Sequence, residues 1–407
     1  MYEDINISDR VSELRRRRGL TQEDLADRTG LSVPTIKKIE QGRGGARMET
    51  YHTIARALGV VTLAFVTPQA PKPRVDTNQD AALAGMRSAI NPPLNLNGEP
   101  MASPHLDEPD LRMLKQAVAA ISAAYVSDRY DTVAQLTPAV VHSAHFHVRE
   151  LDGQDEHTAR QLRAGALSVA GRYLIQVREH DLALFALRDS LRDALAVGDQ
   201  AAAAAAISFQ AWALMRQARF SEVESLCVAA ADQVEPKIST ARTEELGAWG
   251  FLLLRAAGAA ARNNRPDSAE EYLSVATAAA AATGRETKVK GSWSWGPVTV
   301  GVQGPQLALL AGRPDKALEL SDRLPQEAGR TMDNDWHRHR IDVAKASVMT
   351  GDADRATEIL TKIKQASPEW MEHQQSARDV AEDILASRKR MPTEEQRALA
   401  DFLHVQV

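Results

Sequence analysis

The sequence has little of the residues that several folds and sites require. Cysteine occurs once, at Cys227, so the chain can hold no internal disulfide framework, and this scarcity fits a reducing cytoplasm. Aromatic residues make up only 5% of the chain, whereas alanine is abundant. Because small side chains let helices pack closely, this composition favours helices over sheets.

Long apolar runs are also lacking. The opening residues, MYEDINISDR, show no basic segment followed by an apolar one, so no secretion signal is predicted. The longest apolar candidate, 247–261, falls short of the roughly 18 residues that a membrane span needs, and it contains Arg255. We therefore expect no membrane partner.

Motifs for catalysis and for metal binding are missing as well. The chain contains no Walker loop, no G-x-S-x-G, no H-E-x-x-H and no dinucleotide fingerprint, so we expect neither an enzyme nor a cofactor. His142, His145 and His147 could suggest a metal site. On a helix, however, only the first two share a side, and no cysteine or carboxylate completes a set with firm spacing. No metal is predicted.

Charge is present but unevenly spread. The whole chain has a net charge of −5, yet residues 10–47 hold ten Lys/Arg against five Asp/Glu. The remainder of the chain therefore sums to −10. A basic head on an acidic body indicates that only the head meets a polyanion.

A helix, a turn and a second helix are predicted at the centre of residues 11–58. Thr21 followed by Asp24 resembles a capping box at the start of the first of these helices. Gly30 lies in the turn, and Ser32 is placed to cap the second helix. Apolar residues recur so that both helices can bury one face against each other. Flanking helices are expected at 7–18, 48–58 and 60–65, which makes five in the head.

Composition changes after the head. Seven prolines between residues 68 and 104 forbid a continuous helix or strand, so 69–107 is interpreted as a linker with one short helix at 80–89. From residue 108 onward helical periods dominate, and the helices pair as hairpins. The segment 291–303 breaks this pattern with glycines, a proline and two tryptophans.

An internal repeat supports the hairpins. Aligned on their fifth residues, the turns inside the pairs are spaced 39, 46, 48 and 39 residues apart. The body therefore resembles a tetratricopeptide-like (TPR-like) solenoid, although its period exceeds the roughly 34 residues of the standard repeat. The repeated turn segments are His180–Leu184, Arg219–Val223, Arg265–Ala269, Arg313–Ala317 and Asp352–Ala356.

The head also resembles a known family. Leu20–Ala26, Gly30–Ser32, Thr35-Ile36 and Ile39–Gly42 are together similar to the Xre/Cro-type helix-turn-helix family, over residues 8–66. In that family the third helix lies in the DNA major groove and the second crosses the backbone. The expected fold is all-α, with an Xre/Cro-type domain at 1–68, a proline-rich linker at 69–107 and a TPR-like body at 108–407.

The resemblance implies specific roles in the head. Arg15 and Glu40 occupy the places of an ion pair that ties helix one to helix three. Val33 and Pro34 replace the polar readers that the family commonly has, so Lys37 and Lys38 carry more of the expected base contact. The alternative is that these charges are merely solvated. The residues implied to meet phosphates or base edges are Gln22, Ser32, Val33, Pro34, Thr35, Lys37, Lys38, Arg43 and Arg47.

Xre heads joined to TPR-like bodies resemble the RRNPP peptide-sensing regulators. The resemblance implies a concave groove lined by the first helix of each hairpin. Trp212 and Trp249 could instead be core between hairpins, and Trp293 and Trp295 could form either a packed elbow or a ligand-gating loop. The candidates to bind a ligand are Tyr173, Gln176, Gln210, Trp212, Trp249, Trp293, Trp295, Gln303, Trp336 and His339.

These observations predict a bacterial, cytoplasmic, nucleoid-associated transcriptional regulator. A head of this size buries little DNA surface, so we expect a homodimer on an inverted repeat of double-stranded DNA, with half-sites about 34 Å apart. The body is expected to dimerise and to sense a small molecule or peptide. Two alternatives stay open: a body that serves as a scaffold for a partner protein, and an antitoxin- or phage-type repressor without an effector.

Overall fold

A computed structural model describes residues 7–17, 20–43, 46, 48–58, 77–93, 95–96, 108–289, 293–325, 333–387 and 391–405. Over this part of the chain the fold is helical from α1 to α21, with a single two-stranded sheet. The prediction of an all-α chain with a helical-repeat body is confirmed. In the same residues, no helix is long and apolar enough to cross a membrane.

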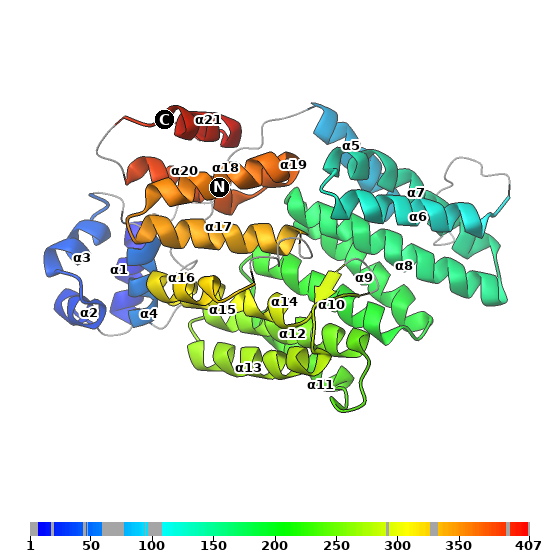
Figure 1. The fold of residues 1–407 in the computed structure, drawn as a ribbon, viewed down its shortest axis with the longest axis horizontal. Coiled ribbons are helices and arrows are strands. Elements are labelled where there is room, and N and C mark those ends of the chain that lie inside the picture. The colour runs from blue at the N-terminus through cyan, green and yellow to red at the C-terminus, as the bar shows by residue number, and fades with distance from the viewer. Residues whose placement is uncertain are drawn as a thin grey trace.

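The head forms a small helical unit at one end of the molecule (Figure 1). Val11, Leu25, Ile36 and Ile54 are fully buried and bring its helices around one core. The expected helix at 60–65 lies outside the described residues. The helices of the head are α1 (Ile7–Arg17), α2 (Gln22–Thr29), α3 (Val33–Glu40) and α4 (Met48–Leu58).

A longer helix than expected lies within the proposed linker. It is α5 (Thr77–Ile90), and it buries Leu83, Met86 and Ala89 in the same core as the first hairpin of the body. Gly85 sits against Pro138, where an added Cβ would lie 3.4 Å from the proline Cγ. The packed core of the body therefore begins before residue 108.

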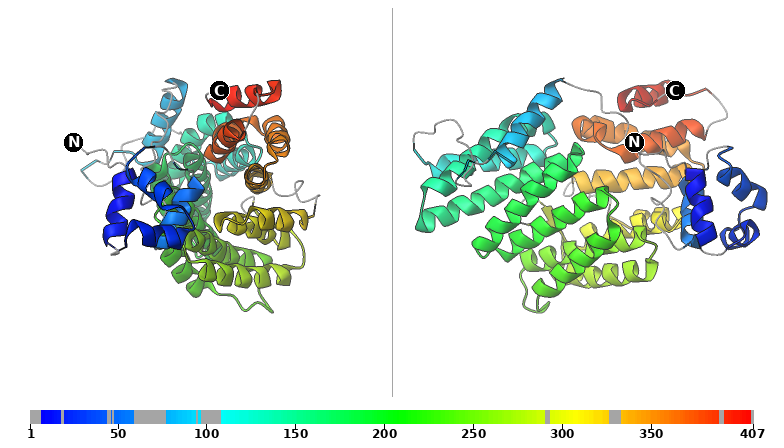
Figure 2. Two further views of the ribbon diagram at one scale, coloured as in Figure 1. Left: turned by 90° about the vertical axis from the view of Figure 1, so that its left-hand side faces the viewer. Right: turned by 180° about the vertical axis from the view of Figure 1, so that it is seen from behind.

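The body begins with stacked antiparallel helices (Figures 1 and 2). Their inner faces are rich in buried alanine, which lets neighbouring helices approach closely. At Gly171, for example, an added Cβ would lie 2.5 Å from Cγ of Leu187 on the next helix. These helices are α6 (Leu111–Val126), α7 (Tyr130–Glu150), α8 (Gly153–Gln176), α9 (His180–Ala196), α10 (Gln200–Arg216), α11 (Phe220–Val234), α12 (Thr243–Arg262) and α13 (Pro266–Thr283).

The tight turns of the body share one backbone conformation. In each, a residue with φ between 57° and 92° is followed by a residue whose N–H donates to the carbonyl five positions earlier, at 2.8 to 3.1 Å. This is the hydrogen bond of a Schellman helix ending. Only some of these positions are glycine, so a search for glycine finds only part of the repeat. The left-handed residues are Asp128, Arg178, Gly198, Ala218, Asn264, Gly312 and Gly351.

This shared turn corrects the sequence alignment at one place. The residue four positions into each second helix is buried, as Val223, Ala269, Ala317 and Ala356 are. In α9 that position is Ala183 and not Leu184, which is only partly buried. The sequence pattern therefore places the packed residue of the first repeat at Leu184, one residue too late.

The C-terminal helices return to the first hairpins of the body. The Gln374 side chain donates to Oε1 of Gln176 at 3.3 Å, and the ring of His373 lies 5.9 Å from that of Tyr130. The array therefore curls around an enclosed concave side. These helices are α14 (Pro297–Gly301), α15 (Gln303–Leu310), α16 (Pro314–Asp322), α17 (Asp333–Met349), α18 (Ala353–Ala366), α19 (Pro368–Glu372), α20 (Gln375–Ala386) and α21 (Glu394–Leu403).

A β-hairpin occupies the segment that broke the helical pattern. Strands β1 (Thr287–Val289) and β2 (Trp293–Trp295) pair antiparallel, an element that the sequence did not predict. Trp295 is fully buried and fills a notch over α12. An added Cβ at Gly250 would lie only 1.9 Å from its Cη2 atom. Glycine at this position therefore makes room for the indole ring.

Candidate functional site

The helix-turn-helix is shaped by local hydrogen bonds. Thr21 and Asp24 form a capping box, in which the Asp24 N–H donates to Oγ1 of Thr21 at 3.0 Å and the Thr21 N–H donates to the Asp24 carboxylate at 2.8 Å. Gly30 ends α2 with φ of 67°, a left-handed conformation that favours glycine. Ser32 then caps α3 by accepting the N–H of Thr35 at 3.3 Å.

A buried ion pair holds α3 against α1. Nε of Arg15 donates to Oε1 of Glu40 at 2.6 Å, and Nη2 donates to Oε2 at 3.0 Å. The side chains are 9% and 5% exposed. Gln22 adds a bond from its amide to Oε2 of Glu40 at 2.7 Å. Burial alone would raise the pKa of Glu40, but the hydrogen bonds from Arg15 and Gln22 outweigh it and hold that pKa below its usual range.

The opposite face of α3 is exposed and basic. Pro34, Lys37 and Lys38 are exposed, and Arg43 follows them in the exposed segment after the helix. Within the described residues neither Lys37 nor Lys38 forms an ion pair, so both ammonium groups are available to a polyanion. Gln41, exposed one helical turn beyond Lys37, joins this face and was not singled out from the sequence.

The remaining predicted DNA contacts differ in their surroundings. Ser32 is exposed, and its hydroxyl is 2.8 Å from that of Thr35. Val33 is half-buried and packs partly against the core of the head. Gln22 braces Glu40, as noted above, so its amide is engaged inside the protein. Arg47 lies outside the described residues.

A cavity of about 150 Å³ lies on the concave side of the body. The inner helices α6, α8, α10 and α12 form most of its wall, and the β-hairpin and α17 complete it. Its lining residues are Tyr125, Val126, Arg172, Gln176, Ala205, Ser208, Phe209, Trp212, Ala248, Phe251, Arg255, Lys288, Ser294, Asn334, Asp335 and Arg338.

Three arginines of this wall lie against aromatic rings. The guanidinium carbon of Arg172 is 4.3 Å from the ring centre of Tyr125 and 5.2 Å from that of Phe209. Arg338 and Arg255 lie 4.8 Å and 5.7 Å from the ring of Trp212. Sequence reasoning missed these arginines as ligand candidates. The available signal was a charged residue inside an otherwise apolar helix, as in Leu254-Arg255-Ala256.

The predicted ligand residues are only partly gathered at this cavity. Gln176 and Trp212 line it. Tyr173, Trp249, Trp295 and His339 do not, because their large side chains are buried where elements pack together. Gln210, Gln303 and Trp336 are half-buried and also outside the wall, and the side chain of Trp293 lies outside the described residues.

The histidines that suggested a metal site take part in helix packing. His147 accepts the Asp110 N–H at its Nε2 atom, 2.9 Å away, and so ties α7 to the start of α6. His145 lies 3.4 Å from Nη1 of Arg163 on α8. Burial, and then the charge of Arg163, lower the pKa of His145 to about 4. Within the described residues, no group of three or more metal-ligating side chains comes together.

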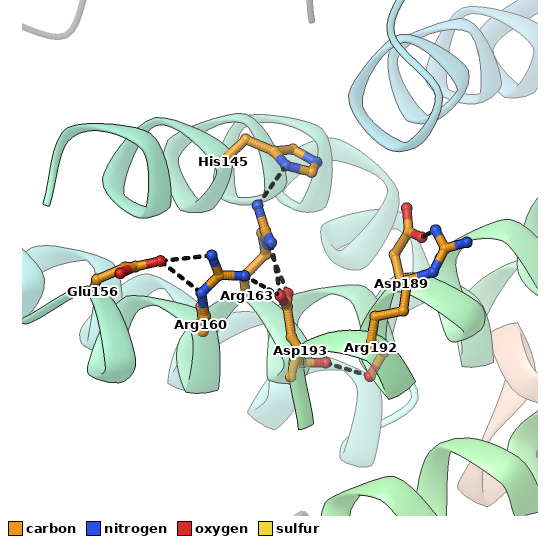
Figure 3. Close-up of polar contacts among 9 residues, drawn as sticks. His145, Glu156, Arg160, Arg163, Asp189, Arg192 and Asp193 are labelled. Carbon is orange, nitrogen blue, oxygen red and sulfur yellow. Dashed lines mark hydrogen bonds and ion pairs between the residues drawn. The ribbon is translucent and has the colours of Figure 1, made fainter. Parts of the chain in front are cut away.

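The same arginine belongs to a fully paired network (Figure 3). Arg163 makes two bonds of 2.7 Å to the carboxylate of Asp193, which is 2% exposed. Arg160 bonds Glu156 at 2.8 Å and lies 3.5 Å from the same aspartate. This network joins α8 to α9 and differs from the cavity wall, where arginines face aromatic rings.

Comparison with known proteins assigns the head. The family model of a helix-turn-helix domain matches residues 7–64. An uncharacterized HTH-type transcriptional regulator, y4dJ, of Sinorhizobium fredii is 37% identical over 62 residues, which are 15% of this chain and 80% of that protein. Another, from Methanothermobacter thermautotrophicus, is 47% identical over 49 residues, 12% of this chain and 71% of that protein.

Solved structures align along nearly the whole chain. A mutant of PrgX covers 97% of this chain and 100% of its own, with 13% identity and a TM-score of 0.27. A PrgX/iCF10 complex covers 97% and 94%, with 12% identity and a TM-score of 0.28. With its capped helices, its exposed basic face and its sequence relatives taken together, the chain belongs to the HTH-type transcriptional regulators.

Proposed function

We propose that this regulator binds a specific operator as a homodimer on an inverted repeat, and that a small molecule or peptide in the body cavity controls this binding. In this proposal the protein acts in the bacterial cytoplasm, at the nucleoid. The ligand shifts the population between arrangements that can and cannot place two heads on DNA.

The observation that carries the proposal is the pair of opposite faces on α3. One face is locked to α1 through Arg15 and Glu40, whose side chains are at most 9% exposed. The other face carries Lys37 and Lys38, both exposed. A rigid helix with free cations on its outer side suits insertion into the major groove, where a lysine can donate to guanine O6 and N7.

The surrounding residues supply positioning contacts in this proposal. Ser32, Thr35, Arg43 and Arg47 meet phosphates, which set the register on the duplex without specifying sequence. Val33 and Pro34 offer apolar contact to a thymine methyl, Val33 with only the part of its side chain that the core leaves free. Gln22 acts chiefly by orienting Glu40, because its amide is bonded there at 2.7 Å.

In this proposal the head binds DNA, and the body dimerises and binds the ligand. The head is 1–68, and the body is 108–407 with α5 packed onto it.

Selection from random duplexes with the full-length protein tests this function. We expect an enriched inverted repeat with half-sites about 34 Å apart, and native mass spectrometry should show two chains per duplex. The double variant Lys37→Ala/Lys38→Ala should enrich no motif while keeping the circular dichroism of the parent. Enrichment of a single half-site with one bound chain would refute the dimer. A protein that co-purifies in place of a small ligand would favour the scaffold alternative.

A further inference from the structure

The cavity of the body carries an excess of positive charge. Its wall contains Arg172, Arg255, Arg338 and Lys288 but a single carboxylate, Asp335. This excess contrasts with residues 108–407 as a whole, which hold 35 Lys/Arg against 41 Asp/Glu. Cations are therefore concentrated at one cavity of an otherwise acidic domain.

The three arginines lack the carboxylate partner that Arg163 has. Within the described residues, none of the three has a carboxylate oxygen within 4.0 Å, whereas Arg163 has two bonds of 2.7 Å to Asp193 (Figure 3). Arg172 is 6% exposed, and its Nε is buried without a hydrogen-bond partner. A buried charge left unpaired is unfavourable, and an anion in the cavity would relieve it.

The aromatic rings do not use the N–H donors of these arginines, although Nε of Arg255 donates to Oγ of Ser208 at 3.4 Å. A ring stacked on a guanidinium covers its flat face and leaves the in-plane N–H groups able to bind a planar oxyanion with two parallel bonds. The guanidinium of Arg172 lies over the rings of Tyr125 and Phe209, and that of Arg338 lies over the ring of Trp212. Because each cation is already positioned, little side-chain freedom is lost when a ligand binds.

We propose that the cavity binds a small organic anion, with its carboxylate or phosphate group on Arg172, Arg255 and Arg338 and an apolar body against Phe209, Trp212 and Phe251. This proposal rests on the proposed function in one respect, namely that the anion is the effector. A cavity of about 150 Å³ is comparable to a cavity that takes up one benzene molecule, so we expect a ligand built around about one such ring.

The bound anion joins two parts of the array that lie far apart in the chain. Arg172 and Arg255 lie on the inner helices α8 and α12, whereas Arg338 lies on α17, which follows the β-hairpin in the chain. When Arg172, Arg255 and Arg338 all bind one anion, α17 is held against the inner helices α8 and α12. The ligand therefore stabilises one curvature of the solenoid, and this is the physical basis for a change in the body.

Three probes of nearly one size and shape, benzoate, benzamide and benzamidine, test the charge preference together with the larger phenyl phosphate. Benzoate and phenyl phosphate are anionic, benzamide is neutral and benzamidine is cationic. Isothermal titration of the full-length protein should show benzoate and phenyl phosphate binding about tenfold to a hundredfold more tightly than benzamide, the ratio expected for a charge-assisted hydrogen bond. Benzamidine should not bind. Equal affinity for benzoate and benzamide would overturn the proposal.

Variants locate the site. Arg172→Gln, Arg255→Gln and Arg338→Gln should each abolish the preference for the anions. Arg262→Gln is the matched control, because Arg262 lies on α12 two helical turns beyond Arg255, donates to the Gly258 carbonyl at 2.9 Å and does not line the cavity. It should keep the preference. If Arg172→Gln fails to fold, Arg338→Gln is the deciding variant, because Arg338 is only half-buried. An unchanged anion preference in Arg338→Gln would refute the assignment of the anion to this cavity.

Two further measurements separate this inference from the proposed function. Lys37→Ala/Lys38→Ala should retain the anion preference, and its loss there would place the anion on the head and overturn the cavity site. The affinity of the protein for its selected duplex is then measured with and without benzoate. A change of affinity supports the effector role. Anion binding in the cavity without such a change supports the site and contradicts the regulatory part of the proposed function.

Discussion

The buried pair of Arg15 and Glu40 should decide whether α3 is held in place. In Glu40→Gln the Arg15 guanidinium stays buried without its carboxylate, and the side chains concerned are only 9% and 5% exposed. Removing one partner of a buried ion pair costs about 3–5 kcal/mol. Since small domains are stable by roughly 5–15 kcal/mol and this head is small, much of its stability would be lost.

A double-mutant cycle isolates the pair. Arg15→Met removes the other charge and strands Glu40, although Gln22 still donates to it at 2.7 Å. The variant with both changes leaves no unpaired charge, so it should be less destabilised than the sum of the single variants by about 1–3 kcal/mol.

Hydrogen exchange of the α3 amides in the full-length chain measures the local stability of the head. Arg16→Met is the matched control, because Arg16 is the exposed neighbour of Arg15, and it should change the free energy of opening by about 0.5 kcal/mol or less. The reasoning would be refuted if Glu40→Gln exchanged as slowly as this control. Strictly additive effects in the cycle would also refute it, because the pair would then behave like a surface pair.

Three other outcomes are expected. Lys38→Ala should weaken binding to the selected duplex by about 1–3 kcal/mol and relax the sequence preference at one base pair, measured by fluorescence anisotropy on the selected duplex and its single-base variants; an unchanged preference would contradict its contact with a base edge. Gly250→Ala should lower the melting temperature, because its Cβ would lie 1.9 Å from Trp295, whereas Gly304→Ala, whose Cβ would lie 3.6 Å from a leucine methyl, should not; equal effects would contradict the notch. Burial, and then the charge of Arg340, lower the pKa of His339 to about 4. As the pH falls below the usual value of 6.5, His339 is therefore protonated in the unfolded chain but stays neutral in the folded protein. The folded protein should therefore lose about 2 kcal/mol between about pH 7 and about pH 5 on account of this residue, and His339→Gln, followed by urea unfolding, should remove that loss.

Local signals account for what sequence predicted well. The caps at Thr21 and Ser32 use hydrogen bonds between residues three positions apart, so they can be predicted from the local sequence. The turn between them is marked by Gly30. The exposed basic face of α3 follows from the same register, because Lys37 and Lys38 fall opposite the buried Ile36 and Ile39.

The repeat was also predictable from local signals, but its exact register was not. The helix pairs show in the recurring turn segments, yet Ala183 and Leu184 could not be told apart as the packed residue. That choice depends on a left-handed residue, Arg178, which carries no glycine signal. The β-hairpin was missed because the room for Trp295 is made by Gly250, on a helix far away in the chain.

Sequence by itself determined the helical class, the capped helices of the head and the existence of a repeating body, because each depends on contacts between residues close in the chain. Only the tertiary structure decided that the array curls back on itself and gathers Arg172, Arg255 and Arg338 around one cavity. The bond from Gln374 to Gln176 spans 198 positions of the chain. No periodicity within a helix specifies which distant helix it will meet, so the ligand site is a property of the assembled body.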